Sequence, residues 1–395
     1  MTKKRTTDFT HYTPAHHAWA YLSRVCGGPQ PAIHALLAAG HTITKIAHAV
    51  RHREEWIGPL LAITQTRYQR DHAAADLRQI TALGGRMICA EDPEFQGLGF
   101  EQSFGFAQEG LWSARADVYP PLALWVIGQD LRTLCSYSCS IVGARNHSNY
   151  GTHHARSIAR DLSHGHATIV SGGALGIDAV AHEACLDAGG NTIAVFAGGL
   201  NQLYPRSNVR LFARIPEKGA LVSEYPPDFY AKRHRFLTRN RLVAALSQGT
   251  VVIEAGFRSG ALNTLSWAAA LGKAAMVLPG PADSSYSLGC HERLRNREAE
   301  LILHAKDIAA LLNPKLELAM LDIDVAGMRP TQKLSHKELQ VFDALSKYPQ
   351  GHGDIANAAG FSTGLTLTLL VALEKAGLAQ RQGAKWLKTP RALEL

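Results

Sequence analysis

The sequence predicts an α/β protein: a doubly wound, mostly parallel β-sheet with a small N-terminal all-α domain and a C-terminal winged helix. From about residue 119, short apolar runs alternate with helical ones, which is the βαβ repetition of a doubly wound fold. On either side, apolar residues recur mainly at three- and four-residue spacing, which favours helices. At 395 residues, the chain is long enough for two or three domains, each with its own core.

The first 90 residues are expected to form the small helical domain. Between Ala18 and Leu83, four stretches have helical spacing and are separated by Gly or Pro: "AWAYLSRV", "PAIHALLAAG", "ITKIAHAVRH" and "YQRDHAAADLRQITALGG". Residues 91–118 are rich in Gly, Phe and Gln and lack periodicity. We therefore expect them to connect this domain to the sheet.

Residues 119–312 are expected to form the sheet domain. The predicted strands are 122–128, 138–143, 167–172, 192–198, 220–225, 250–256 and 274–280, with helical runs between most of them. The strands are apolar throughout rather than alternating, which is typical of a parallel sheet covered on both faces.

A polar linker is expected at 313–332, and a compact helical unit at 333–395. Three helical runs followed by a short hairpin, "AQRQGAKWLKT", describe a winged helix. Many winged helices bind duplex DNA, but others dock proteins. With Lys385 and Lys388 as the main charges of the wing, both alternatives stay open.

Composition excludes several classes of protein. With 46% hydrophobic and 19% charged residues the chain is expected to be globular, and no run of eighteen apolar residues predicts a membrane span. The basic start has no apolar segment behind it, so we expect no secretory signal and a cytoplasmic location. The six cysteines form no CxxC pair and are expected to be reduced. The histidine clusters have no Cys or carboxylate at ligand spacing in the sequence, so no metal site is expected.

Positive charge is concentrated in one region. The net charge is +8, and the region 230–260 holds six basic residues against one acid, Glu254. Within it, "KRHRFLTRNR" (232–241) carries Phe236 at its centre and precedes the apolar run "LVAALS". The stretch is either a solvated loop or the lining of a groove for a long anion.

Four Gly-rich turns follow predicted strands, at the edge where doubly wound sheets bind ligands. They are "GARNHSNYG" (143–151) with Gly143, Arg145 and Ser148; "SGGALGID" (171–178) with Ser171, Gly172 and Gly176; "AGGLNQLYP" (197–205); and "EAGFRSGALNT" (254–264) with Ser259 and Gly260. Successive glycines beside a helix N-terminus form an anion-binding nest. The alternative is that these glycines only make tight turns.

No known cofactor or nucleophile motif is present. The sequence lacks the GxGxxG, GxxxxGK[ST] and GxSxG patterns, which disfavours nicotinamide, ATP and serine-hydrolase chemistry, and we expect no cofactor. Glu224, Glu254 and Asp178 lie near strand ends and leave a two-carboxylate hydrolase open, although capping and structural hydrogen bonds explain such residues more often.

The basic cluster and the Gly-rich turns would share one edge of the sheet. Several cationic groups around an aromatic ring fit consecutive phosphates with a base stacked on Phe236, and only single strands offer bases for stacking. The sequence therefore favours single-stranded nucleic acid as the partner. The alternative for Phe236 is a core anchor for the following helix.

The ordered motifs "IVGAR…YG", "SGGALGIDAVAH", "GGNTIAVFAGGLNQLYP", "GALVSEYPP", "RFLTRNRLVAALS", "VVIEAGFRSGALNT" and "VLPGP" closely resemble the DNA-processing protein A (DprA/Smf) family from about Tyr119 to Leu303. The flanking domains resemble family members through weaker motifs, the first as a SAM- or helix-hairpin-like domain. The resemblance implies an extended Rossmann-like core that binds single-stranded DNA, a homodimer, and delivery of strands to the RecA recombinase in natural transformation. It implies no enzymatic activity.

Carried over by position, the resemblance assigns single-stranded DNA binding to Arg145 in the first turn, to Arg233, Phe236, Arg239, Asn240 and Arg241 in the basic stretch, and to Ser171, Gly172, Gly176, Ser259 and Gly260 in the nests. The sequence departs from the family pattern in three places. Leu175 stands where the family usually has Arg, and Leu237 stands where it has proline. In 289–299, an Arg and a Glu occupy positions where apolar residues and Gly are common, which bears on the local helix end and on the dimer surface.

Two rival functions remain. One is a hydrolase of nucleotides or phosphoribosyl compounds on a related fold, and the other is a transcription factor acting through the winged helix. The sequence does not choose between a role in transformation and one in general DNA repair.

Overall fold

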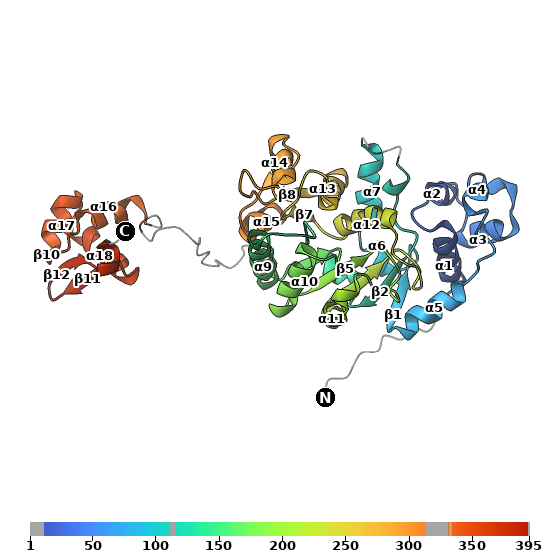
Figure 1. Cartoon of the computed structure of the whole chain (residues 1–395), viewed down its shortest axis with the longest axis horizontal. Coiled ribbons are helices and arrows are strands. Elements are labelled where there is room, and N and C mark those ends of the chain that lie inside the picture. The colour runs from blue at the N-terminus through green and yellow to red at the C-terminus, as the bar shows by residue number, and fades with distance from the viewer. Residues whose placement is uncertain (1–11, 111, 113–114, 313–330, 332–333, 394–395) are drawn as a thin grey trace, which may run out of the picture. The chain divides into compact units, whose positions relative to one another are not determined.

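The computed structural model describes residues 12–110, 112, 115–312, 331 and 334–393 (Figure 1). The chain divides into two compact units, Met1–Met320 and Leu321–Leu395. The predicted linker at 313–332 lies outside the described residues except for position 331, as does the basic stretch before Tyr12.

A nine-stranded sheet forms the centre of the first unit, in the order β1-β2-β6-β5-β4-β3-β7-β8-β9. Its strands are β1 (Gly85–Ile88), β2 (Leu124–Gly128), β3 (Ser138–Val142), β4 (Thr168–Ser171), β5 (Thr192–Phe196), β6 (Ala220–Ser223), β7 (Gly249–Val252), β8 (Ala274–Val277) and β9 (Glu300–Leu301). Strands β3 to β9 run parallel, and β2 runs antiparallel between β1 and β6. The α/β class and the mostly parallel sheet are confirmed, and each of the seven predicted strands is present.

Two strands of this sheet were not predicted. β1 lies inside the segment expected to be all-helical and pairs with β2, with its four residues buried. Four residues, "GRMI", are too short to show a strand rhythm against the surrounding helices. β9 has only two residues and pairs with β8 at the edge.

Helices surround this sheet. They are α1 (Pro14–Cys26), α2 (Pro31–Ala38), α3 (Ile43–His52), α4 (Leu60–Thr64), α5 (Ala73–Ala82), α6 (Pro93–Gln96), α7 (Phe100–Glu109), α8 (Leu131–Cys135), α9 (Asn149–His164), α10 (Ile177–Asp187), α11 (Val209–Arg214), α12 (Arg233–Ala245), α13 (Gly260–Ala270), α14 (Leu288–Arg295) and α15 (Ala305–Leu312). α6 and α7 lie where only a connecting region was expected, and α7 buries Phe100 and Phe104.

The helices cover both faces of the sheet. α12, α13 and α7 pack on the face that carries Val142 and Val170. α9, α10 and α15 pack on the opposite face, against Ile141 and Ile169. The N-terminal helices and α11 form one core with Trp125 and the strands near the β1 edge. Because side chains alternate between faces, buried residues at successive strand positions produce the continuous apolar runs of the sequence.

The strand order changes direction at β3. β4, β5 and β6 follow on one side of β3, whereas β7, β8 and β9 lie on the other. At such a switch point the loops after neighbouring strands diverge and leave a crevice at their carboxyl ends, where open α/β sheets bind ligands.

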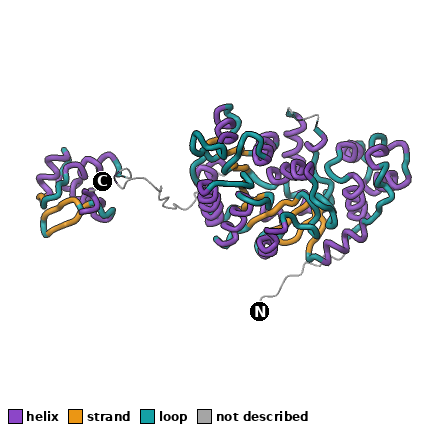
Figure 2. The backbone as a smooth tube through the Cα atoms, viewed as in Figure 1, coloured by secondary structure: helices purple, strands orange, loops and turns teal. Residues whose placement is uncertain are grey.

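The second unit contains α16 (His336–Ala344), β10 (Gln350–Gly351), α17 (His352–Ala359), α18 (Thr363–Lys375), β11 (Ala379–Gln382), β12 (Lys385–Lys388) and α19 (Pro390–Leu393). Its antiparallel sheet has the order β10-β12-β11. Figure 2 shows the strands of the described residues in orange and the helices in purple. The predicted helices and hairpin are present, while the winged-helix assignment and the partner of this unit stay predictions.

None of the described helices is by itself long and apolar enough to cross a bilayer. α17 and α18 together have the length and composition for a span, but they are bent by 101°. Their apolar residues include Ile355, Leu370 and Leu373, which pack in the core of the second unit.

A buried histidine makes the first unit sensitive to acid. His182 on α10 is fully buried beside the Thr192 hydroxyl, and burial, with a smaller effect of Arg239, lowers the pKa of His182 to about 3. The unfolded chain takes up this proton near the usual pKa of about 6.5, so it binds more protons than the folded chain between the two values. Stability should therefore fall as pH drops from about 6.5 towards 3.

We expect His182→Asn to flatten this dependence, because the substitution removes the titrating ring. Thermal melts of both proteins at stepped pH measure it. Equal slopes for wild type and variant would contradict the assignment.

Candidate nucleic-acid interface

A pocket of about 720 Å³ lies at the carboxyl ends of β3, β4 and β7, at the switch point of the sheet. Its lining includes most of the predicted site residues: Gly143, Arg145, Gly172, Arg233, Phe236, Arg239, Asn240, Ser259 and Gly260. The structure therefore brings together residues of all four Gly-rich turns, the third of them through Tyr204, and the basic stretch, at the edge that the strand pattern led us to expect.

The basic stretch is the first part of a helix and not a loop before one. α12 begins at Arg233, so the charged residues and the apolar run that follows them belong to a single element. Positions 233, 236, 237, 240 and 243 line the pocket, which is the three- and four-residue spacing of one helix face. Charges on several sides of the helix hid this pattern from the sequence.

An aromatic and cationic cluster forms one wall of the pocket. The Arg145 guanidinium lies 5.5 Å from the centre of the Phe236 ring, and Tyr204 meets that ring edge-on at 5.9 Å. Arg145 and Arg233 are exposed, Phe236 is half-buried and Tyr204 is 53% exposed. Exposed guanidinium groups beside accessible rings can contact phosphates and stack bases at the same time.

Arg239 is buried beneath this wall. Its Nη1 donates hydrogen bonds to the carbonyl oxygens of Gly172 and Val195, at 2.5 Å each. Burial lowers the pKa of Arg239 to about 10, against the opposing charge of Asp178. A Cβ on Gly172 would lie 2.3 Å from Nη1, so the close approach of this side chain requires glycine. Arg239 contributes charge from below the pocket and holds the turn after β4.

The anion nest predicted at 171–178 contains a carboxylate of the chain itself. Asp178 Oδ2 accepts hydrogen bonds from the backbone N–H of Gly172 (3.1 Å) and Ala174 (3.3 Å). Burial raises the pKa of Asp178, and the charge of Arg239 opposes this rise. These two donors are therefore already used, and Gly172 contributes to the pocket as lining rather than as an anion donor.

Glycines shape the turn that presents Arg145. Gly176 has φ 86°, and a Cβ there would lie 2.3 Å from the carbonyl oxygen of Ala144. A Cβ on Gly143 would lie 2.7 Å from the Ile177 side chain. The Arg145 turn thus packs directly on the start of α10, which fixes its position although Gly176 itself does not line the pocket.

Ser148 and Ser171 do not line the pocket. Ser148 caps α9 by accepting the N–H of Gly151 at 3.1 Å, and its own N–H and hydroxyl donate to the buried Glu254 carboxylate. The Ser171 hydroxyl donates to the carbonyl of Ile141 at 2.6 Å. Both side chains thus make structural contacts within the fold, and their proposed contact with DNA finds no support in this arrangement.

Arg241 also lies outside the pocket. It is fully buried, forms an ion pair with Glu224 and stacks over Phe104 at 5.2 Å. It follows Arg239 by two positions, so it points to the other side of the helix. Glu224 and Glu254, two of the three carboxylates considered for a hydrolase, each make buried contacts of this kind.

Asn240 and Ser259 join α12 to the start of α13. Asn240 Nδ2 donates to the Gly260 carbonyl and to Asn263 Oδ1, both at 3.2 Å, and the Ser259 hydroxyl accepts the N–H of Ala261 at 3.2 Å. Nothing lies within 4 Å of a Cβ built on Gly260. The positive N-terminal end of α13 thus opens on the pocket and favours an anion there.

The positions that depart from the family pattern differ in whether they line the pocket. Leu237 is 53% exposed and lines the pocket, whereas Leu175 is 48% exposed but does not line it. In the 289–299 segment, Arg293 forms an ion pair with Glu298. The effect of this segment on dimer formation stays a prediction.

Tyr204 is the main pocket residue that the sequence interpretation missed. It lies in the Gly-rich turn 197–205, which was noted for its glycines only. Tyr204 could have been found from the sequence, because it is an aromatic residue in a turn at the same sheet edge as Phe236.

Comparisons with known proteins identify the family of the chain. The family model of DNA recombination-mediator protein A matches residues 110–313. The chain is 40% identical over 385 residues, 94% of each chain, to a Mycobacterium tuberculosis protein whose provisional name is DNA processing protein DprA. It is 42% identical over 188 residues to Protein Smf of Escherichia coli, which covers 45% of this chain and 50% of that one.

Among solved structures, DNA processing protein A from Streptococcus pneumoniae matches with a TM-score of 0.61 and 26% identity, over 77% of this chain and 99% of that chain. The family assignment rests on the family model and on the Mycobacterium tuberculosis relative. The fold shared with the Streptococcus pneumoniae structure agrees with it. The chain therefore belongs to the DNA recombination-mediator protein A family, the DprA/Smf proteins.

Proposed function

We propose that this protein binds single-stranded DNA as a recombination mediator, and that the pocket at the switch point holds the strand. The observation that carries the proposal is the cluster of Arg145, Phe236 and Tyr204, with Arg233 exposed on the same pocket. Exposed cations suit consecutive phosphates and accessible rings suit unpaired bases. Membership of a family of recombination mediators supports the same function.

The finer parts of the proposal rest on the family resemblance. In it, the protein acts in the cytoplasm as a homodimer, protects incoming strands and loads the RecA recombinase, as in natural transformation. It acts without catalysis. The carboxylates considered for a hydrolase support this, because Glu224 and Glu254 make buried contacts away from the pocket and Asp178 accepts two backbone N–H groups.

The test is a competition between single- and double-stranded oligonucleotides at two salt concentrations. We expect single strands to win at both. Preference for the duplex would contradict the proposal, and the same experiment on a panel of base compositions should show little sequence dependence.

The salt dependence identifies the residues. Each phosphate contact contributes about 0.7 to the slope of log K against log salt for single strands, so Arg145→Ala and Arg233→Ala should each weaken binding and flatten the slope by about that amount. Arg160→Ala on α9 is the matched control, since this exposed arginine is paired with Asp161 away from the pocket. Arg239→Ala is a poor test because that side chain holds two backbone carbonyls.

Unchanged slopes in both pocket variants would mean that the strand binds elsewhere. Equal flattening in Arg160→Ala would show that the measurement reports net charge rather than a local contact.

A further inference from the structure

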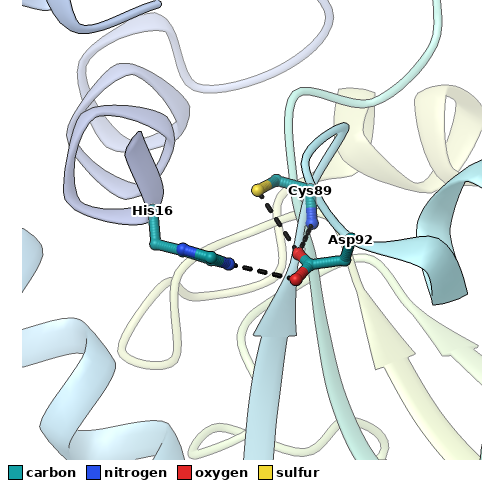
Figure 3. Close-up of side chains that lie close together, drawn as sticks. All are labelled: His16, Cys89 and Asp92. Carbon is teal, nitrogen blue, oxygen red and sulfur yellow. Dashed lines mark hydrogen bonds and ion pairs between the residues drawn. The ribbon is translucent and has the colours of Figure 1, made fainter. Parts of the chain in front are cut away.

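Three side chains with metal-binding atoms lie together at the junction of α1 and the β1–α6 turn (Figure 3). His16 comes from the first turns of α1, whereas Cys89 and Asp92 follow β1. His16 Nε2 lies 3.1 Å from Asp92 Oδ1, and Cys89 Sγ lies 3.4 Å from Asp92 Oδ2. In the sequence, 73 positions separate His16 (residue 16) from Cys89 (residue 89), so no ligand spacing revealed the group.

The donor set is one that zinc prefers. Imidazole nitrogen, thiolate sulfur and carboxylate oxygen bind Zn²⁺ at about 2.0–2.3 Å, which places the ligand atoms of a tetrahedral site roughly 3.3–3.8 Å apart. Here one such atom from each residue lies within 4.8 Å of the others. Each separation would have to shorten by about 1.5 Å at most to reach the spacing of a tetrahedral site.

Supporting contacts fix two of the three groups. His16 Nδ1 accepts the N–H of Thr13 at 3.2 Å, so the ring proton lies on Nε2 and faces Asp92. A metal at Nε2 would displace this proton to Nδ1, where the Thr13 hydroxyl at 2.7 Å can accept it. The Cys89 N–H donates to Asp92 Oδ2 at 2.8 Å, and the Asp92 N–H donates to the Cys89 carbonyl at 2.9 Å. The turn therefore holds the carboxylate beside the sulfur while Oδ1 stays directed at His16.

One of the three side chains is buried, whereas the other two are partly exposed to solvent. Cys89 is fully buried, whereas the side chains of His16 and Asp92 are 12% and 25% exposed. An ion can thus enter from the carboxylate side and reach the sulfur. Binding would release the thiol proton of Cys89, because the thiolate is the ligand.

We propose that His16, Cys89 and Asp92 bind one zinc-type divalent cation, with water in the fourth position. The ion links α1 to the end of β1 and so fastens the N-terminal helices to the edge of the sheet. This site is separate from the pocket and does not depend on the function proposed for it.

The test uses the full chain after treatment with a chelator. Titration with Co²⁺ should give a thiolate-to-cobalt charge-transfer band that saturates at about one ion per chain. Cys89→Ser should abolish the band, and His16→Ala and Asp92→Asn should each weaken binding by at least about tenfold. Zinc should raise the Tm of the wild type and leave that of Cys89→Ser unchanged.

Two controls separate this site from other metal-binding groups. Cys26→Ser removes a different thiol, at the end of α1, and should keep the band. His48→Ala with His52→Ala removes the exposed cluster formed with Glu54, and should also keep it.

Absence of a saturable charge-transfer band in the wild type would overturn the proposal, as would a band that survives in Cys89→Ser. Circular dichroism of each variant without metal checks folding. If His16→Ala fails to fold, Asp92→Asn decides, because the amide keeps the turn contacts but binds metal poorly.

Discussion

Replacing Arg241 by alanine should lower the free energy of unfolding of the first unit by about 3–5 kcal/mol. Arg241 is fully buried and forms its ion pair with Glu224, which is itself 3% exposed. Removing the guanidinium leaves that carboxylate buried without its positive partner. Burial already raises the pKa of Glu224, and Arg241 is the main group that counteracts the rise. Urea denaturation followed by circular dichroism measures the change.

A double substitution provides the control. Arg241→Met combined with Glu224→Leu removes both charges and fills a similar volume, so it should restore much of the lost stability. Arg233→Ala, an exposed change on the same helix, should alter stability by no more than about 0.5 kcal/mol. A small effect of Arg241→Ala on stability, together with a large loss of DNA binding, would return Arg241 to the role that the family resemblance gave it.

Replacing Phe236 by alanine should weaken single-stranded DNA binding by about 5- to 150-fold, because stacking of a base contributes about 1–3 kcal/mol. Phe236 is half-buried in the pocket, and its ring contacts both Arg145 and Tyr204. Tyr204→Ala should have an effect in the same range. Fluorescence anisotropy with a labelled oligonucleotide measures both.

Phe236→Tyr should retain most of the affinity, since the ring remains. Phe106→Ala on α7 is the matched control, because Phe106 is 59% exposed but lies outside this pocket. The alternative for Phe236, a core anchor for α12, predicts a loss of stability with unchanged affinity. Melting curves of Phe236→Ala therefore accompany the binding measurement.

Much of the fold was predictable because buried parallel strands are apolar throughout. The runs around Val142, Val170 and Val252 identified three strands, and the glycines after them identified the edge where the pocket lies. The pocket residues of three turns followed from that edge alone. This reasoning needed only local sequence and the general topology of doubly wound sheets.

The remaining features depend on contacts between distant residues. Nothing near Arg241 indicates that Glu224, 17 positions away, is its partner, so the arginine resembled its neighbours in the basic stretch. Asp178 could be recognised as an acid near a nest, but its bonds to Gly172 and Ala174 depend on how the turn closes. The helical start of α12 was hidden because its apolar residues are few and its charges lie on several sides.

The helical form of α12 affects how binding would proceed. Since the segment is already regular in the folded chain, its backbone entropy was lost during folding and is not lost again when a strand arrives. A phosphate contact made by α12 therefore carries no further backbone ordering cost, and only the side chains that touch the strand lose rotamer freedom. The DNA strand, rather than the protein backbone, must then change conformation on binding. The association rate should therefore be limited by how quickly an unpaired strand adopts the extended form that fits this rigid surface.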